Sequence, residues 1–127
     1  MMAPSYFKPK SAEQMAALLV KVAKTVPKTP FYYYYIPMMN GLVHSVHQVL
    51  TLAQKEAPNV VGSKFTDSNL TDFSNCVEAG FNMLGGGDNV ITHFMDEGGH
   101  GAIGVGFTCL GTMFSNIWDH HAAGRTK

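Results

Sequence analysis

Residues 31–37 read Phe-Tyr-Tyr-Tyr-Tyr-Ile-Pro, and the interpretation of the whole chain starts from this stretch. It is short, apolar and aromatic on both faces of an extended chain, and closed by a proline, which is typical of a strand covered on both sides. Alternation divides the side chains between two faces, with Tyr32 and Tyr34 on one and Phe31, Tyr33 and Tyr35 on the other. The stretch predicts a buried strand of a parallel sheet.

Similar short runs recur along the chain, separated by segments of helical spacing. Strands are predicted at 1–7, 31–36, 60–65, 81–84 and 102–105. Helices are predicted at 11–26, 41–54, 69–79, 88–97 and 110–123. Ser11 with Gln14 forms a capping box, Asp88 is predicted to cap the fourth helix, and Gly124 ends the last one. Five βα units of roughly 25 residues indicate an α/β fold with a parallel sheet.

Length and composition limit the classes of function. The 127 residues, 46% hydrophobic and 14% charged, predict a single domain, 1–127, with a core. Nine basic and nine acidic residues balance, so neither nucleic acid nor an anionic membrane is an expected partner. Cys76 and Cys109 are too few for a disulfide framework. Without a signal-like or membrane-spanning stretch, we expect a soluble, cytoplasmic protein.

Two motif types have ordinary explanations. The spacing Gly99-x-Gly101-x-x-Gly104 matches a dinucleotide fingerprint, but a strand is predicted inside it rather than before it. His44 and His47, three apart on a predicted helix, lack the further ligand that a catalytic zinc needs, and His120 and His121 are adjacent. We interpret these histidines as surface residues and expect no metal site.

Lys64 is the strongest candidate for chemistry. It lies within a short apolar strand, where an edge lysine reaching water is one interpretation. The other is an amine desolvated inside a barrel or sheet, which becomes a nucleophile towards carbonyl carbons. Tyr34 lies one βα unit earlier, and neighbouring strands of such folds are usually sequential, so its phenol could meet the lysine.

Five stretches together carry a resemblance to a known family: Phe31-Tyr32-Tyr33-Tyr34-Tyr35-Ile36-Pro37, Gly62-Ser63-Lys64-Phe65-Thr66-Asp67, Leu70-Thr71-Asp72-Phe73, Gly86-Gly87-Asp88 and Gly101-Ala102-Ile103-Gly104. They resemble the N-acetylneuraminate lyases of the dihydrodipicolinate synthase superfamily. The resemblance implies a partial (β/α)8 TIM barrel, fourth to eighth units, open rather than closed. It also implies homo-oligomers such as a homotetramer, and sialic acid catabolism without a cofactor, through a covalent imine.

The resemblance also implies site residues. Lys64 would form the Schiff base with the keto carbon, and Tyr34 would donate and accept the proton at the hydroxyl of the breaking bond. Substrate-binding positions implied in the same way are Thr66, Gly86, Asp88, Asn89 and Val105. Asn89 stands where the lyases carry a glutamate and Val105 where they carry a serine, so the contacts to the sugar differ here.

The resemblance further implies that strands one to three and their carboxylate-binding loop are missing from these residues. Five strands would leave two edges unpaired and the barrel-facing side uncovered, so we expect association or aggregation. Three interpretations follow: a portion of an N-acetylneuraminate lyase, an inactive fragment or isoform that pairs with itself or a full-length subunit, and a related pyruvate-dependent aldolase.

Overall fold

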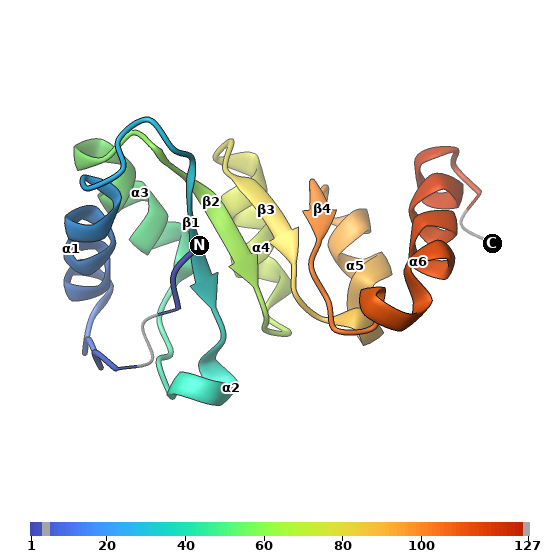
Figure 1. Ribbon diagram of the computed structural model, residues 1–127, viewed down its shortest axis with the longest axis horizontal. Coiled ribbons are helices and arrows are strands. Elements are labelled where there is room, and N and C mark those ends of the chain that lie inside the picture. The colour runs from blue at the N-terminus through green and yellow to red at the C-terminus, as the bar shows by residue number, and fades with distance from the viewer. Residues whose placement is uncertain (4–5, 126–127) are drawn as a thin grey trace.

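The structure, a computed structural model, describes residues 1–3 and 6–125 and contains one parallel sheet. Its order is β1-β2-β3-β4, and each neighbouring pair is parallel. The strands are β1 (Phe31–Tyr35), β2 (Val60–Phe65), β3 (Asn82–Gly85) and β4 (Gly101–Ala102). The predicted α/β class is confirmed, with strands side by side in chain order (Figure 1).

Helices cover one face of this sheet. All helices of the described residues are α1 (Ala12–Ala23), α2 (Pro37–Asn40), α3 (Val46–Glu56), α4 (Leu70–Glu78), the 3-10 helix η1 (Asp88–Val90), α5 (Ile91–Asp96) and α6 (Phe107–Ala122). In Figure 1, α3, α4 and α5 lie behind the strands, while α1 packs on α3 and α6 on α5. The face turned to the viewer, called the open face below, carries no helix of the described residues.

Aromatic side chains dominate the core between the sheet and its helices. The ring of Phe65 in β2 lies 5.6 Å from that of Phe73 in α4, and Phe73 lies 4.8 Å from Phe94 in α5. All three side chains are buried. A second, smaller cluster of Ile91, Met95 and Phe114 attaches α6 to α5. The core therefore holds the backbones of the central strands from one side only.

The burial pattern confirms the predicted alternation in β1. Phe31, Tyr33 and Tyr35 are buried, while the two tyrosines between them are half-buried. Ser11 also caps α1 as predicted, because its hydroxyl accepts the backbone N–H of Gln14 at 3.3 Å. Local pattern is sufficient at both places.

The predicted first strand, 1–7, is wrong in extent. Met2 alone forms a parallel bridge beside β1, donating its N–H to Tyr32 O at 3.0 Å and accepting the N–H of Tyr34 at 2.8 Å. Residues 4–5 lie outside the described residues, and 6–9 are not in a strand. Pro9 has no N–H for a ladder and Lys8 is charged and exposed, so this segment gains little from pairing. The sheet has four strands among the described residues, not five.

Three further boundaries differ. The helix predicted from Gly41 begins at Val46, where a distant carboxylate caps it, as described below. The predicted 102–105 strand is only Gly101–Ala102, and α6 begins at Phe107 and kinks at Leu110. Gly124 ends α6 as predicted, with a φ of 70° that favours glycine. In the described part of the chain, no helix has the length and apolar character needed to cross a membrane.

Candidate active site

The open face presents its side chains in rows, because the three main strands are parallel and in register. One row is Tyr32, Gly62 and Asn82, and the next, two residues on, is Tyr34, Lys64 and Leu84. Beyond them, the ends of all strands meet at one edge of the sheet. In open α/β sheets, ligands bind at the carboxyl ends of the strands, so this edge is where a site is expected.

Lys64 and Tyr34 are brought together as predicted. They are register partners on β2 and β1, and Lys64 Nζ lies 4.2 Å from the centroid of the Tyr34 ring. The contact is a cation–π interaction when the amine is charged. Both side chains are half-buried and no helix of the described residues covers the open face, so the amine is only partly removed from water. An amine and a phenol in contact are the two groups that imine chemistry requires.

A hydrogen-bonded pair forms the row before Lys64. The Tyr32 hydroxyl donates to Asn82 Oδ1 at 3.0 Å and passes over Gly62. A side chain at Gly62 would overlap the backbone carbonyl of Asn82. The pair was not predicted, although Tyr32 and Asn82 stand at matching strand positions on either side of Gly62. It places a polar contact next to Lys64 on an otherwise open surface.

Thr66 extends the open face past Lys64. Its N–H donates to Tyr35 O at 2.9 Å, which continues the strand pairing beyond β2. Its hydroxyl oxygen is buried and has no hydrogen-bond partner among the described residues. Gly86 lies against it, since a Cβ there would overlap Thr66 Oγ1. A buried hydroxyl without a partner costs free energy and is a group that a ligand could satisfy.

The carboxylate of Asp88 lies in the loops that follow β3 and β4. It does not cap a helix, as was predicted: Gly87 is the N-cap of η1, and Asp88 Oδ2 accepts the N–H of Gly106 at 2.8 Å. The carboxylate therefore binds the Gly106 amide, eighteen residues away in sequence, instead of an amide in the first turn of its own helix. Asp88 Oδ1 is buried without a partner among the described residues, and Gly104 packs against it too closely for a side chain.

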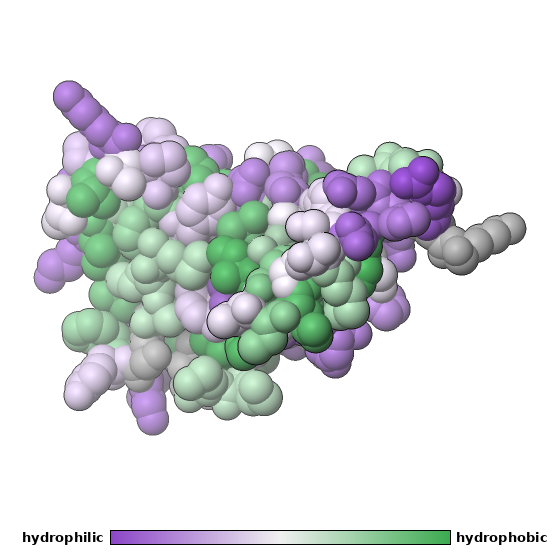
Figure 2. Space-filling view, turned by 45° about the vertical axis from the view of Figure 1, so that its right-hand side comes forward, coloured by the Kyte–Doolittle hydropathy of each residue, from purple (hydrophilic) through white to green (hydrophobic). Residues whose placement is uncertain are grey.

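The remaining two predicted substrate contacts are not packed against this edge. Asn89 is exposed, and the side chain of Val105 is 86% exposed on the loop before α6. Ile103, Leu110 and Met113 are also exposed on β4 and α6 or next to them. Figure 2 shows apolar side chains, in green, on the surface of this forward part of the molecule.

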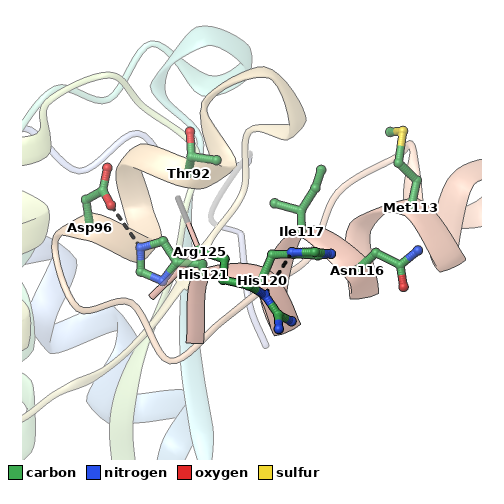
Figure 3. A pocket seen from close by; sticks show the side chains of 8 residues that line it. All are labelled: Thr92, Asp96, Met113, Asn116, Ile117, His120, His121 and Arg125. Carbon is green, nitrogen blue, oxygen red and sulfur yellow. Dashed lines mark hydrogen bonds and ion pairs between the residues drawn. The ribbon is translucent and has the colours of Figure 1, made fainter. Parts of the chain in front are cut away.

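A cavity of about 510 Å³ lies between α5 and α6, away from the strand ends (Figure 3). His121 Nε2 lies 2.8 Å from Asp96 Oδ1, and Arg125 Nε donates to His120 Nδ1 at 3.2 Å. No chemistry-bearing residue of the open face lines it, so its size does not make it the candidate active site. Among the described residues, no group of three metal-ligating side chains is found.

The prediction for His44 is wrong. It was expected on a helix surface with His47, but α3 begins after it, and His44 is half-buried. The Tyr33 hydroxyl and His44 Nε2 are 2.8 Å apart, and the two rings are stacked. Sequence spacing could not reveal this contact, because the segment before α3 is not helical.

Comparison with known proteins assigns the family. The profile of the dihydrodipicolinate synthetase family matches residues 1–127. The chain belongs to this family. N-acetylneuraminate lyase A of Xenopus laevis is 38% identical over 110 residues, which are 85% of this chain and 36% of that protein. N-acetylneuraminate lyase B of the same species is 34% identical over 126 residues, 98% of this chain and 47% of the relative.

Solved structures of this family confirm the architecture. The N-acetylneuraminate lyase, or sialic acid aldolase, of Aliivibrio salmonicida superposes with a TM-score of 0.88 at 26% identity, over 98% of this chain and 44% of that one. The chain thus spans less than half the length of the relatives it matches. The resemblance and the open partial barrel are both confirmed, and the dihydrodipicolinate synthetase family consists of lyases of the aldolase type.

Proposed function

We propose that this chain carries the imine-forming lysine and the proton-transferring tyrosine of an N-acetylneuraminate lyase. The observation that supports this best is the contact of Lys64 Nζ with the Tyr34 ring at 4.2 Å, on adjacent parallel strands beside the sheet edge. Relatives named N-acetylneuraminate lyase, 34% and 38% identical, favour this substrate.

The proposed reaction needs only these two side chains for its covalent steps. The neutral amine of Lys64 attacks the keto carbon of N-acetylneuraminate, and water leaves as the imine forms. The bond between the carbon next to the imine carbon and the following, hydroxyl-bearing carbon breaks, and its electron pair moves towards the protonated imine nitrogen to give an enamine. The phenol of Tyr34 relays the proton of the substrate hydroxyl as that carbon becomes the carbonyl of N-acetylmannosamine. Protonation and hydrolysis of the enamine release pyruvate, so no cofactor is part of the proposal.

Recognition of the sugar would use the unsatisfied groups at the strand ends. The buried oxygens Thr66 Oγ1 and Asp88 Oδ1 lack partners among the described residues. The Thr66 hydroxyl could donate to or accept from a substrate hydroxyl, and the Asp88 carboxylate could accept from one. Gly86 packs directly against the Thr66 hydroxyl, so a side chain at position 86 would displace that group. Asn89 and Val105, where the lyases carry a glutamate and a serine, would reduce polar contacts to the sugar.

Two other functions stay open under this proposal. A related pyruvate-dependent aldolase would use the same lysine and tyrosine, and the matching family is named after such an enzyme, dihydrodipicolinate synthetase. A catalytically silent partner of a full-length subunit, or of a second copy, would instead use the uncovered open face. We place either form in the cytoplasm, in homo-oligomers like those implied by the family resemblance.

Reductive trapping with pyruvate tests the lyase proposal. The folded chain is incubated with pyruvate and borohydride, and intact mass with peptide mapping locates any reduced imine. We expect one adduct, on Lys64. Lys64→Arg keeps the charge and should abolish it, whereas Lys55→Arg, at an exposed lysine of α3, should not. A folded sample without an adduct on Lys64 contradicts the proposal.

Cleavage of N-acetylneuraminate separates the lyase from the other aldolases. We expect pyruvate release from N-acetylneuraminate, and its loss in Tyr34→Phe by about 10²–10⁴-fold while the trapped imine is retained. An imine on Lys64 together with no cleavage of N-acetylneuraminate would assign the chain to another pyruvate-dependent aldolase or to the silent partner.

A further inference from the structure

Behind β1, on the helix side of the sheet, His44 lies in an aromatic cluster that the proposed chemistry does not use. Its Nε2 is 2.8 Å from the Tyr33 hydroxyl. Its ring centroid is 6.0 Å from that of Tyr33, with planes 15° apart, and 5.7 Å from that of Tyr35. Because Tyr33 and Tyr35 flank Tyr34 in the strand, this cluster holds the backbone that presents Tyr34 to the open face.

The same cluster extends to the loop that follows Lys64. The Tyr35 ring, 5.7 Å from that of His44 and 5.3 Å from that of Phe65, also lies near the carboxylate of Asp67, three residues past Lys64. Thr66 between them donates its N–H to Tyr35 O at 2.9 Å. Through Tyr35, the segment at His44 is therefore joined to the ends of both β1 and β2.

The contact with Tyr33 changes when His44 is protonated. With the ring proton on Nδ1, His44 Nε2 accepts the proton of the buried Tyr33 phenol. Protonated His44 can only donate to the Tyr33 oxygen, so the phenol proton loses its acceptor while a charge enters a half-buried site. Burial lowers the pKa of His44, and the carboxylate of Asp72 on α4 opposes that effect. The titratable groups that face it are thus Tyr33 and Tyr35 of β1 and Asp72, with Asp67 reached through Tyr35.

We propose that neutral His44 is a positioning residue that holds the ends of β1 and β2 in register, so that Tyr34 and Lys64 stay in contact. Its protonation in mild acid releases the segment at residues 41–45 and loosens that alignment. The link to catalysis rests on the proposed imine chemistry, whereas the conformational change does not. His44 is on the covered face and touches no substrate.

The direction of the pH effect follows from the burial. The unfolded chain binds a proton at His44 near the ordinary value of about 6.5, while the folded chain resists it. The contribution of His44 to stability is therefore complete above that pH and declines as the pH falls below it. The released state should accumulate on the acidic side only.

A pH series of near-ultraviolet circular dichroism tests the conformational part without any substrate. We expect the tyrosine signal to change below about pH 6.5 in the wild-type chain and equally in Lys64→Arg. His44→Gln supplies an acceptor for the Tyr33 hydroxyl that does not titrate, so it should keep the neutral-pH spectrum and lose the acid transition. His47→Gln, at the neighbouring half-buried histidine, should leave the transition in place.

The rate of imine trapping on Lys64 tests the positioning role. Below the imidazole transition, the ratio of the wild-type rate to the His44→Gln rate should fall, approaching about tenfold per pH unit. At neutral pH the two rates should agree, and His44→Leu, without an acceptor, should be slower at every pH. An acid transition that survives in His44→Gln overturns the proposal. Loss of the adduct with the transition intact contradicts only the proposed function.

Discussion

Three consecutive tyrosines, Tyr33 to Tyr35, have different environments because a strand alternates its faces. Tyr34 lies against Lys64 on the open face, while its two neighbours are buried beside His44 and the helices. Burial raises the pKa of Tyr33 above its ordinary range. Burial and the nearby carboxylate of Asp67 raise the pKa of Tyr35 to about 12.

Raising the pH should therefore unfold the chain, because the two buried phenols ionise more easily in the unfolded state. The unfolded chain ionises them near pH 10, below their pKa in the fold, so their contribution to stability is complete below about pH 10. It is lost as the pH rises from there towards 12, the pKa of Tyr35. We expect late phenolate absorbance that coincides with the loss of helical circular dichroism. If all phenolates formed near pH 10 in a chain that stayed folded, this expectation would be wrong.

At this scale, sequence reasoning succeeded where contacts are local or in register. Alternation in 31–35 and the pairing of Tyr34 with Lys64 are confirmed, because strand geometry decides both. The cap assigned to Asp88 is wrong, since its partner, Gly106, is distant in sequence. The environment of His44 was equally inaccessible, as it depends on how the chain crosses from β1 to α3. The roles of the site residues stay predictions.

Among the elements, α3 depends on a residue of another helix. Asp72 of α4 accepts the Val46 N–H at 2.6 Å, the Ser45 hydroxyl at 2.7 Å and the His47 N–H at 3.3 Å. These groups form the amino end of α3, where a negative charge also interacts favourably with the positive end of the helix dipole. The start of α3 at Val46 is explained by this carboxylate together with Ser45, the N-cap of α3, whose hydroxyl accepts the Gln48 N–H at 3.2 Å. The spacing of Ser45 and Gln48 in the sequence indicates such a cap, whereas the contribution of Asp72 could not be read from it.

Removal of that carboxylate should destabilise the fold measurably. Asp72→Ala leaves two backbone N–H groups of α3 without their acceptor, and we expect a loss of about 2–3 kcal/mol in the free energy of unfolding. Urea denaturation followed by circular dichroism measures it. Ser45→Ala, which removes one cap hydroxyl and keeps Asp72, should cost about 1 kcal/mol. Equal losses in the two variants would show that Asp72 is not the dominant cap.

The molecule as a whole is a sheet with one covered and one open face. Its span of less than half of each relative fits four parallel strands, where a (β/α)8 barrel has eight. The α/β class could be predicted from the repeated units, while the number of strands in the sheet could not. The predicted first strand is reduced to the bridge at Met2 because pairing there depends on which partners surround it.

The open face and the apolar loop before α6 should make the 127-residue chain self-associate. Val105 is exposed on that loop and Leu110 and Met113 are exposed on α6, and exposed apolar patches drive association. Gel filtration with light scattering should give a mass that rises with protein concentration. Val105→Ser with Leu110→Ser should reduce it, whereas Val26→Ser, at an exposed valine after α1, should not. A concentration-independent monomer would contradict this prediction.

The closeness of Gly62 to the Asn82 carbonyl also limits how this sequence can vary. Any side chain at position 62 would displace the backbone of β3 and separate Tyr32 from Asn82. Lys64 lies two residues further along the same strand and face, so that displacement would also reach the amine. In a library of all substitutions at position 62, only glycine should preserve both the fold and the reactivity of Lys64. A residue with no functional group is then as constrained by selection as the lysine beside it.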